Sequence, residues 1–150
     1  SLFNLTGAAA CRAINTMDAM LGYRDERERL GWCAARMDDI LNFIPARITV
    51  LLLLIWFAGR GTCSRAWHVM RRDCHKRPGF NGGIVMAVMA GGTGIRFEKP
   101  GVYTIGDGNR TLDEGGADIL RATRAVTLMY ATIACCTLFL LGTVINNIGI

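Results

Sequence analysis

Carboxylates, amides and arginines are concentrated between residues 15 and 47, immediately before an apolar run that begins at Ile48. Polar side chains this dense beside a membrane-like segment are costly unless a ligand, a metal ion or water meets them. The pattern therefore suggests a site for a highly charged substrate at a membrane surface. The candidate residues of this stretch are Asn15, Asp18, Arg24, Arg36, Asp38, Asp39, Asn42 and Arg47.

Two adjacent carboxylates, Asp38 and Asp39, are followed by the amide of Asn42. Oxygen ligands of this kind hold Mg²⁺, which also bridges phosphate groups. A solvated helix start with surface ion pairs is the simpler alternative, and the spacing alone leaves it open. Arg24 follows Gly22-Tyr23 at an expected turn, and the forked guanidinium of arginine suits phosphate or carboxylate groups.

Two glycine-rich segments farther along the chain give weaker signals. Gly91-Gly92-Thr93-Gly94 either cradles a phosphate through its backbone N–H groups or packs closely against a neighbouring element, and it lacks the ending of a P-loop. Residues 106–110 form an anion-binding loop or, more simply, a tight turn. The sequence leaves these alternatives open.

The composition narrows the class of protein. The 150 residues suffice for one domain, 51% of them are hydrophobic, and the net charge is +5. A basic balance is compatible with anionic lipids or anionic substrates. The chain lacks the interleaved aromatic and basic residues of single-strand binders and any zinc-finger or helix-turn-helix pattern, so we expect no nucleic-acid partner.

The elements that must position these residues are mostly helical. Residues 125–145 contain no charge and would form a helix about 31 Å long, enough to cross the hydrocarbon core of a bilayer. The region between the two apolar stretches is basic and glycine-rich, which by the positive-inside tendency predicts cytoplasmic loops. The expected order is a truncated helix (1–22), a polar block (23–47), a short apolar helix (48–58), a cytoplasmic region (60–124) and a transmembrane helix (125–145).

The apolar stretch 48–58 is too short to cross a bilayer, since eleven residues reach only about 16 Å as a helix. Pro45 would break or kink a longer helix just before it. If this stretch did cross, the polar blocks 15–47 and 72–110 would lie on opposite membrane faces and could not build one site. We therefore predict a re-entrant or surface-lying helix with both blocks in the cytoplasm.

Taken together, these segments resemble the adenosylcobinamide-phosphate synthase family, the integral-membrane enzymes of cobalamin biosynthesis. The resemblance spans about residues 10 to 110 of the chain. Family chains are roughly twice as long, so we expect the C-terminal half of a single polytopic membrane domain. The residues that carry the resemblance are Ala13 to Arg24, Gly31-Trp32, Ala35 to Asp39, Asn42 to Arg47, Arg72-Asp73, Pro78, Asn81, Gly83, Met89 to Gly91, Gly94 to Gly101, Tyr103 and Gly106.

The resemblance implies ATP-dependent amide formation between a carboxylate of adenosylcobyric acid, a corrinoid, and an aminoalcohol phosphate, at the inner membrane and in a multi-pass protein. The expected cofactor is Mg²⁺, with ATP as co-substrate and the lipid bilayer and the missing N-terminal half as partners. We assign Asp38 and Asp39 to Mg²⁺ and Asp18 to a third ligand or the general base. Arg24, Arg36 and Arg47 would clamp anions, Asn15 and Asn42 would orient ligands, and Asn81 and Asp107 would line a second wall.

Two other functions remain open. A transferase of phospho-alcohol head groups also pairs aspartates near a membrane helix, but those aspartates are typically four residues apart, whereas Asp38 and Asp39 are adjacent. A non-catalytic membrane subunit that binds or anchors a corrinoid is the other alternative, and it includes a fragment that is inactive without the family's N-terminal half. ATP turnover that depends on corrinoid and aminoalcohol phosphate would separate an enzyme from a binder.

Overall fold

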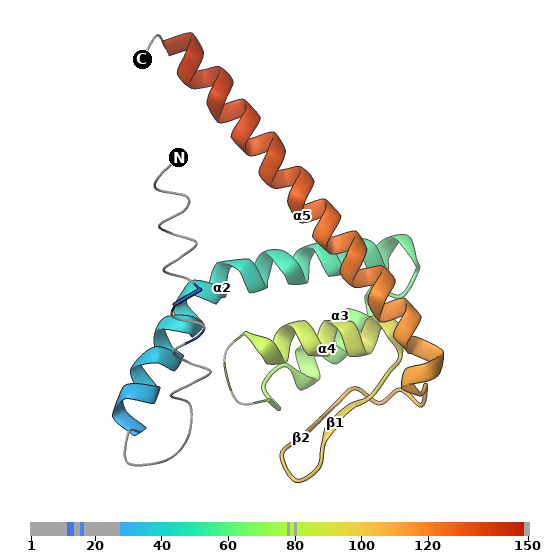
Figure 1. Cartoon of the computed structure of the whole chain (residues 1–150). Coiled ribbons are helices and arrows are strands. Elements are labelled where there is room, and N and C mark those ends of the chain that lie inside the picture. Colours follow the sequence, from blue (N-terminus) through green and yellow to red (C-terminus); the bar gives the residue numbers. More distant parts are fainter. Residues whose placement is uncertain (1–11, 14–15, 17–27, 78, 80, 149–150) are drawn as a thin grey trace.

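The computed structural model describes residues 12, 13, 16, 28–77, 79 and 81–148. These residues are mostly helical, as the sequence predicted, with one small antiparallel hairpin (Figure 1). The elements are α2 (Glu28–Gly59), α3 (Cys63–Asp73), α4 (Gly82–Thr93), β1 (Phe97–Lys99), β2 (Tyr103–Ile105) and α5 (Leu112–Ile148).

The first long helix, α2, corrects the predicted separation of a polar block from a short apolar helix. Residues 48–58 are the last part of one continuous helix of 32 residues that contains Pro45. Proline removes one helical hydrogen bond and its ring presses on the preceding turn, so it can bend a helix without ending it. Figure 1 shows α2 changing direction between its first and second halves.

The helix α4 lies in the glycine-rich region for which the sequence predicted loops, and it corrects that prediction. Glycine is unfavourable in an exposed helix, but here it permits close approach of neighbouring elements. A Cβ atom on Gly91 would lie 2.7 Å from the Cα atom of Ala66 in α3, and one on Gly92 would overlap the ring of Phe57 in α2. Close packing is therefore the role of this glycine pair.

The last helix, α5, contains the predicted transmembrane stretch and begins thirteen residues before it. Its start is a capping box: the backbone N–H of Glu114 donates to Thr111 Oγ1 at 3.4 Å, and the N–H of Thr111 donates to Glu114 Oε2 at 3.1 Å. By length and composition, Arg36–Gly59 and Asp113–Val144 are both apolar enough to cross a membrane.

The core lies where α2, α3, α4 and the first half of α5 meet. Leu53 and Phe57 of α2, Val69 of α3 and Val88 of α4 are each 2% exposed or less. Beyond this contact the second half of α5 extends away from the other elements (Figure 1). Most of the large side chains there are at least half exposed: Leu128, Ile133, Leu138, Phe139, Leu140, Leu141 and Val144.

Candidate functional site

The two polar stretches singled out in the sequence meet at the start of α4. The side-chain amide of Asn81 donates to the backbone carbonyl of Asp39 at 2.8 Å, and Arg47 Nη1 donates to Asn81 Oδ1 at 3.4 Å. The guanidinium carbon of Arg47 lies 4.2 Å from the centre of the Phe43 ring, which fixes its plane. Asp39, Phe43 and Arg47 follow at intervals of four and so share one face of α2.

The N-terminus of α4 adds positive potential to this junction. Its first turn carries no acidic residue. The side chain of Asn81 bonds to the Asp39 carbonyl of α2 and does not cap α4. The guanidinium of Arg77 lies against Gly82, where a Cβ atom would collide with it. The free N–H groups and the helix dipole, together with Arg47 and Arg77, favour a phosphate or carboxylate there.

The adjacent carboxylates point in different directions. Asn42 Nδ2 donates to Asp38 Oδ1 at 2.8 Å, four residues away on the same face of α2. Consecutive helical residues are about 100° apart, so Asp39 is turned toward the face that carries Arg47. In the part of the chain that the structure describes, no three His, Cys, Asp or Glu side chains gather to hold a metal ion. One or two carboxylates with phosphate oxygens can hold Mg²⁺, so magnesium binding by Asp38 and Asp39 stays a prediction.

Asp73, which sequence reasoning did not single out as a site residue, is the most buried charge of the described structure. Its carboxylate is 0% exposed and accepts hydrogen bonds from Arg72 Nε at 2.8 Å and Nη2 at 2.9 Å, from the Lys76 amine at 2.8 Å and from the Gly106 N–H at 2.8 Å. The hydrogen bonds from Arg72 hold the pKa of Asp73 well below its usual range. Asp73 thereby ties α3 to the end of the hairpin.

Asp107, the predicted second-wall residue, lies at the exposed edge of this cluster, with 64% of its side chain exposed. Arg72 Nη1 pairs with Asp107 Oδ2 at 2.7 Å, which lowers the pKa of Asp107 and raises that of Arg72. Cys74, the residue after Asp73, rests its carbonyl against Gly83 in the first turn of α4, whereas Gly106 lies against Ala90 toward the end of that helix. A lone aspartate among the six cations of residues 60–77 was the sequence signal for Asp73.

The structure places the other predicted residues as follows. Arg36 lies exposed on α2, three residues before Asp39. Asn15, Asp18 and Arg24 lie outside the described residues. The structure thus brings together Asp39, Arg47 and Asn81, joins Asp38 to Asn42, and adds Arg77, which the sequence reading missed.

The two glycine loops serve packing. Arg65 Nε donates to the carbonyl of Gly91 at 2.6 Å, so a cation already covers the C-terminal end of α4. Gly108 lies against the carbonyl of Gly94, where a Cβ atom would overlap it. The N–H of Gly106 is taken by Asp73.

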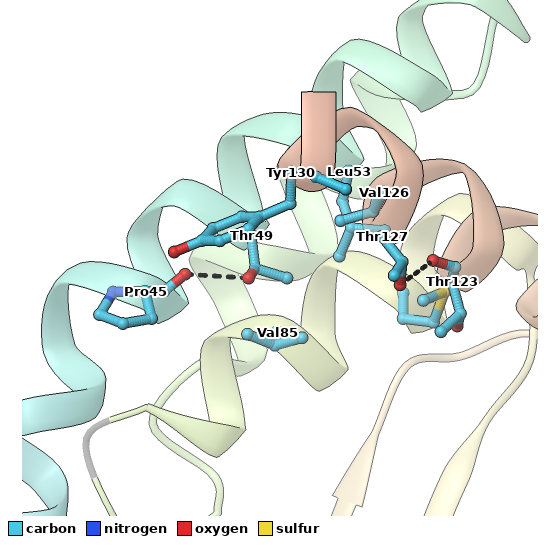
Figure 2. Close-up of a pocket in the computed structure, with 10 residues that line it drawn as sticks. Pro45, Thr49, Leu53, Val85, Thr123, Val126, Thr127 and Tyr130 are labelled. Carbon is cyan, nitrogen blue, oxygen red and sulfur yellow. Dashed lines mark hydrogen bonds between the residues drawn. The ribbon is translucent and has the colours of Figure 1, made fainter. Parts of the chain in front are cut away.

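A pocket of about 520 Å³ lies between α2, α4 and α5 (Figure 2). Its threonine hydroxyls are turned toward their own helices: Thr49 Oγ1 donates to the carbonyl of Pro45 and Thr127 Oγ1 to that of Thr123, both at 2.9 Å. Most of the remaining lining is apolar, so this pocket suits hydrocarbon and is distinct from the charged junction.

Comparisons with known proteins give one consistent family. A family described as "CobD/Cbib protein" matches residues 1–134. The chain is 41% identical over 140 residues to the "Probable cobalamin biosynthesis protein CobD" of Methanothermobacter thermautotrophicus, covering 89% of the chain and 46% of that relative. It is 40% identical over 165 aligned positions to the "Cobalamin biosynthesis protein CobD" of Geobacter metallireducens, covering 98% and 48%.

A third relative, the "Cobalamin biosynthesis protein CobD" of Dehalococcoides mccartyi, is 45% identical over 112 residues, with 74% of the chain and 36% of the relative covered. The chain thus spans about half the length, or less, of these curated relatives. No solved structure matches the chain.

Proposed function

The chain belongs to the CobD/Cbib protein family, and from that premise we propose that it is part of an adenosylcobinamide-phosphate synthase acting in cobalamin biosynthesis. The complete enzyme would join a carboxylate of a corrinoid, adenosylcobyric acid, to the amine of an aminoalcohol phosphate at the expense of ATP. The long apolar helix α5 supports a location in the cell membrane. In this proposal the complete enzyme is multi-pass, and its polar junction faces the cytoplasm.

The chemistry demands a site that tolerates several anions. The corrinoid carboxylate would attack the γ-phosphorus of ATP, releasing ADP and leaving an acyl phosphate. The amine would then attack the acyl carbon, inorganic phosphate would leave, and a base would take the proton of the amine. ATP and the aminoalcohol phosphate repel the carboxylate, so cationic groups must offset that repulsion, and positioning and electrostatics supply most of the rate.

The junction of α2 and α4 supplies such groups. Arg47 and Arg77 flank the N-terminus of α4 and would hold phosphate oxygens together with the backbone N–H groups of its first turn. Arg36 and Arg24 would extend this positive surface, and Asn15 and Asn42 would orient ligands. The cluster of Asp107 with Arg72 and Asp73 would fix the neighbouring wall.

Magnesium would enter with the nucleotide. Asp39, on the face of α2 that carries Arg47, would supply the first protein ligand, and Asp38 a second after release from Asn42. Bound Mg²⁺ would neutralise phosphate charge and orient the γ-phosphoryl group. Asp18 would act as general base for the amine or as a further ligand.

The single observation that carries the proposal is the pair of hydrogen bonds from Asn81 to Asp39 and from Arg47 to Asn81. These contacts join residues from both family-like stretches into one polar junction. A membrane anchor would not require them.

The test is mass-spectrometric detection of the amide product from membranes that express the complete gene. Product is expected only when corrinoid, aminoalcohol phosphate, ATP and Mg²⁺ are all supplied. Corrinoid binding without ATP turnover would favour a non-catalytic subunit and overturn the proposal. Transfer of a phospho-alcohol to lipid would favour a head-group transferase.

A further inference from the structure

Residues 40–58 of α2 have two faces of opposite environment. Ile40, Ile44, Leu51 and Ile55 are 71%, 67%, 58% and 50% exposed. At about 100° per residue these positions fall within about 60° of one another, and Arg47 falls at the edge of the same stripe. Leu53 and Phe57, on the opposite side, are buried against α3 and α4. An apolar stripe of this length, left open to solvent, marks an interaction surface.

Length and composition alone would let Arg36–Gly59 cross a bilayer, but the polar residues argue against it. Arg47 lies at the middle of that segment and donates to Asn81, a neutral amide. A crossing helix would place both groups at the centre of the hydrocarbon, where an arginine is most costly.

The packing of α3 gives a second, independent argument. Only three residues separate this helix from the end of α2, and the two helices share a core through Val69 and Phe57. Its exposed side chains include three arginines, Arg65, Arg71 and Arg72. If α2 crossed the membrane, this charged helix would be carried into lipid with it.

The arrangement of the elements fits a membrane surface. Figure 1 shows α3, α4 and the hairpin to one side of α2, whereas the free half of α5 extends past the other side. That half of α5 exposes apolar side chains such as Leu138 and Phe139, at 60% and 71%, as expected of a helix in lipid.

We propose that residues 40–58 of α2 lie along the surface of a lipid bilayer, with the stripe Ile40, Ile44, Leu51 and Ile55 inserted among the acyl chains. Among the described helices, α5 alone crosses the bilayer, and α3, α4 and the hairpin stay on the watery side. Arg47 then reaches the head-group level beside Asn81. This inference rests on the membrane location in the proposed function and is independent of the reaction.

The test uses the complete protein in vesicles of phosphatidylethanolamine and phosphatidylglycerol. Nitroxide labels are placed singly by Ile40→Cys, Ile44→Cys, Leu51→Cys and Ile55→Cys in a background without other cysteines. Power saturation with oxygen and with a water-soluble nickel chelate reports the depth of each label. The proposal predicts equal, shallow depths at Leu51 and Ile55, which follow the bend at Pro45, and no greater depth at Ile40 and Ile44, which precede it.

Two results would overturn it. Depths that increase from Ile40 to a maximum near Leu51 and then decrease would show that α2 crosses. Labels shielded from both reagents would show that another protein segment covers the stripe. Labels at Leu128→Cys and Leu138→Cys in α5 serve as controls, with increasing depth expected. Water-exposed α5 labels would instead refute the membrane location itself and leave the reaction to be judged by its own assay.

A second measurement covers the case in which the cysteine-free protein does not fold. Met37→Cys and Ser64→Cys, both exposed, flank the segment in question. The variant protein, with its natural cysteines kept, is placed in sealed vesicles and treated with an impermeant, mass-tagged maleimide. Peptide mass spectrometry should find both added thiols labelled, or neither. Labelling of one only would show that α2 crosses the bilayer.

Discussion

The side-chain amide of Asn81 donates a 2.8 Å hydrogen bond to the backbone carbonyl of Asp39, 42 residues earlier in the chain. This bond links the first residue before α4 to the polar half of α2. Arg47 joins it from two turns farther along α2. One small amide therefore holds together the two stretches whose residues are expected to bind a common set of anions.

Replacement of Asn81 should loosen this junction. Asn81→Ala removes one donor and one acceptor, each worth about 1 kcal/mol, so the free energy of unfolding should fall by about 1–2 kcal/mol and turnover should fall with it. Thermal unfolding of the complete protein in detergent and product formation measure the two effects. Asn109→Ala, at an exposed residue outside the helices and strands, is the matched control. Equal behaviour of the two variants would contradict the role of Asn81.

A change of Arg47 should affect substrate binding more than stability. Arg47→Lys keeps the charge but loses the planar group that lies 4.2 Å from the Phe43 ring centre and bonds to Asn81. We expect KM for the aminoalcohol phosphate to rise about tenfold, which corresponds to about 1.4 kcal/mol. Arg121→Lys, at an exposed position paired with Asp118, should leave KM unchanged. An unchanged KM in Arg47→Lys would remove this residue from the anion site.

The buried Asp73 should contribute stability that depends on pH. Its hydrogen bonds from Arg72, and then those from Lys76 and Gly106, hold the pKa of Asp73 below its usual range in the folded state. A lower pKa in the folded state than in the unfolded chain means that the stabilisation is complete at neutral pH. It is lost as the pH falls below about 4, toward the folded-state pKa.

Two substitutions separate the charge of Asp73 from its hydrogen bonds. Asp73→Asn retains an acceptor for the Gly106 N–H, whereas Asp73→Ala leaves that buried donor without a partner. We expect losses of about 1 and about 3 kcal/mol respectively at neutral pH, as measured by chemical unfolding of the complete protein. Asp73→Asn should also flatten the acid dependence. A wild-type-like decline below about pH 4 in that variant would show that other carboxylates cause it.

Glycine packing at the end of α4 gives a prediction that concerns the fold alone. Gly92→Ala would force a methyl group into the ring of Phe57, and we expect a loss of about 1–3 kcal/mol. Gly142→Ala, in the free part of α5, meets nothing within 4 Å and should be neutral or slightly stabilising. Unfolding in detergent compares the two, and a neutral Gly92→Ala would show that α4 sits farther from α2 than described.

The sequence predicted the helical class and located the long apolar helix, because an uncharged run as long as residues 125–145 is typical of a membrane-spanning helix. It did not predict that α2 continues through Pro45. Local rules allow proline either to end or to bend a helix, and packing against α3 and α4 decides between them. It also missed α4. A glycine-rich segment considered alone indicates turns, and its role in close packing can be recognised only when the neighbouring helix is known.

The candidate site was predicted in its residue types and only partly in its geometry. Residue chemistry and family likeness singled out Asp39, Arg47 and Asn81, which the structure brings together. Adjacent residues of a helix point in different directions, so the separation of Asp38 from Asp39 could have been predicted from the sequence once a helix was expected there. The partners of Asp73 and Asp107 depend on how the hairpin folds back on α3, and no local pattern predicts that contact.

The most direct test of the central claim, that the two polar stretches form one catalytic site, is a double-mutant cycle on amide formation. Asp39→Asn and Asn81→Ala are measured singly and together in membranes that express the complete gene, with Asn109→Ala as control. Each single change should lower product formation, Asp39→Asn by about a hundredfold or more, and the double variant should be no worse than Asp39→Asn. Full activity in Asp39→Asn, or losses that simply multiply, would contradict the account.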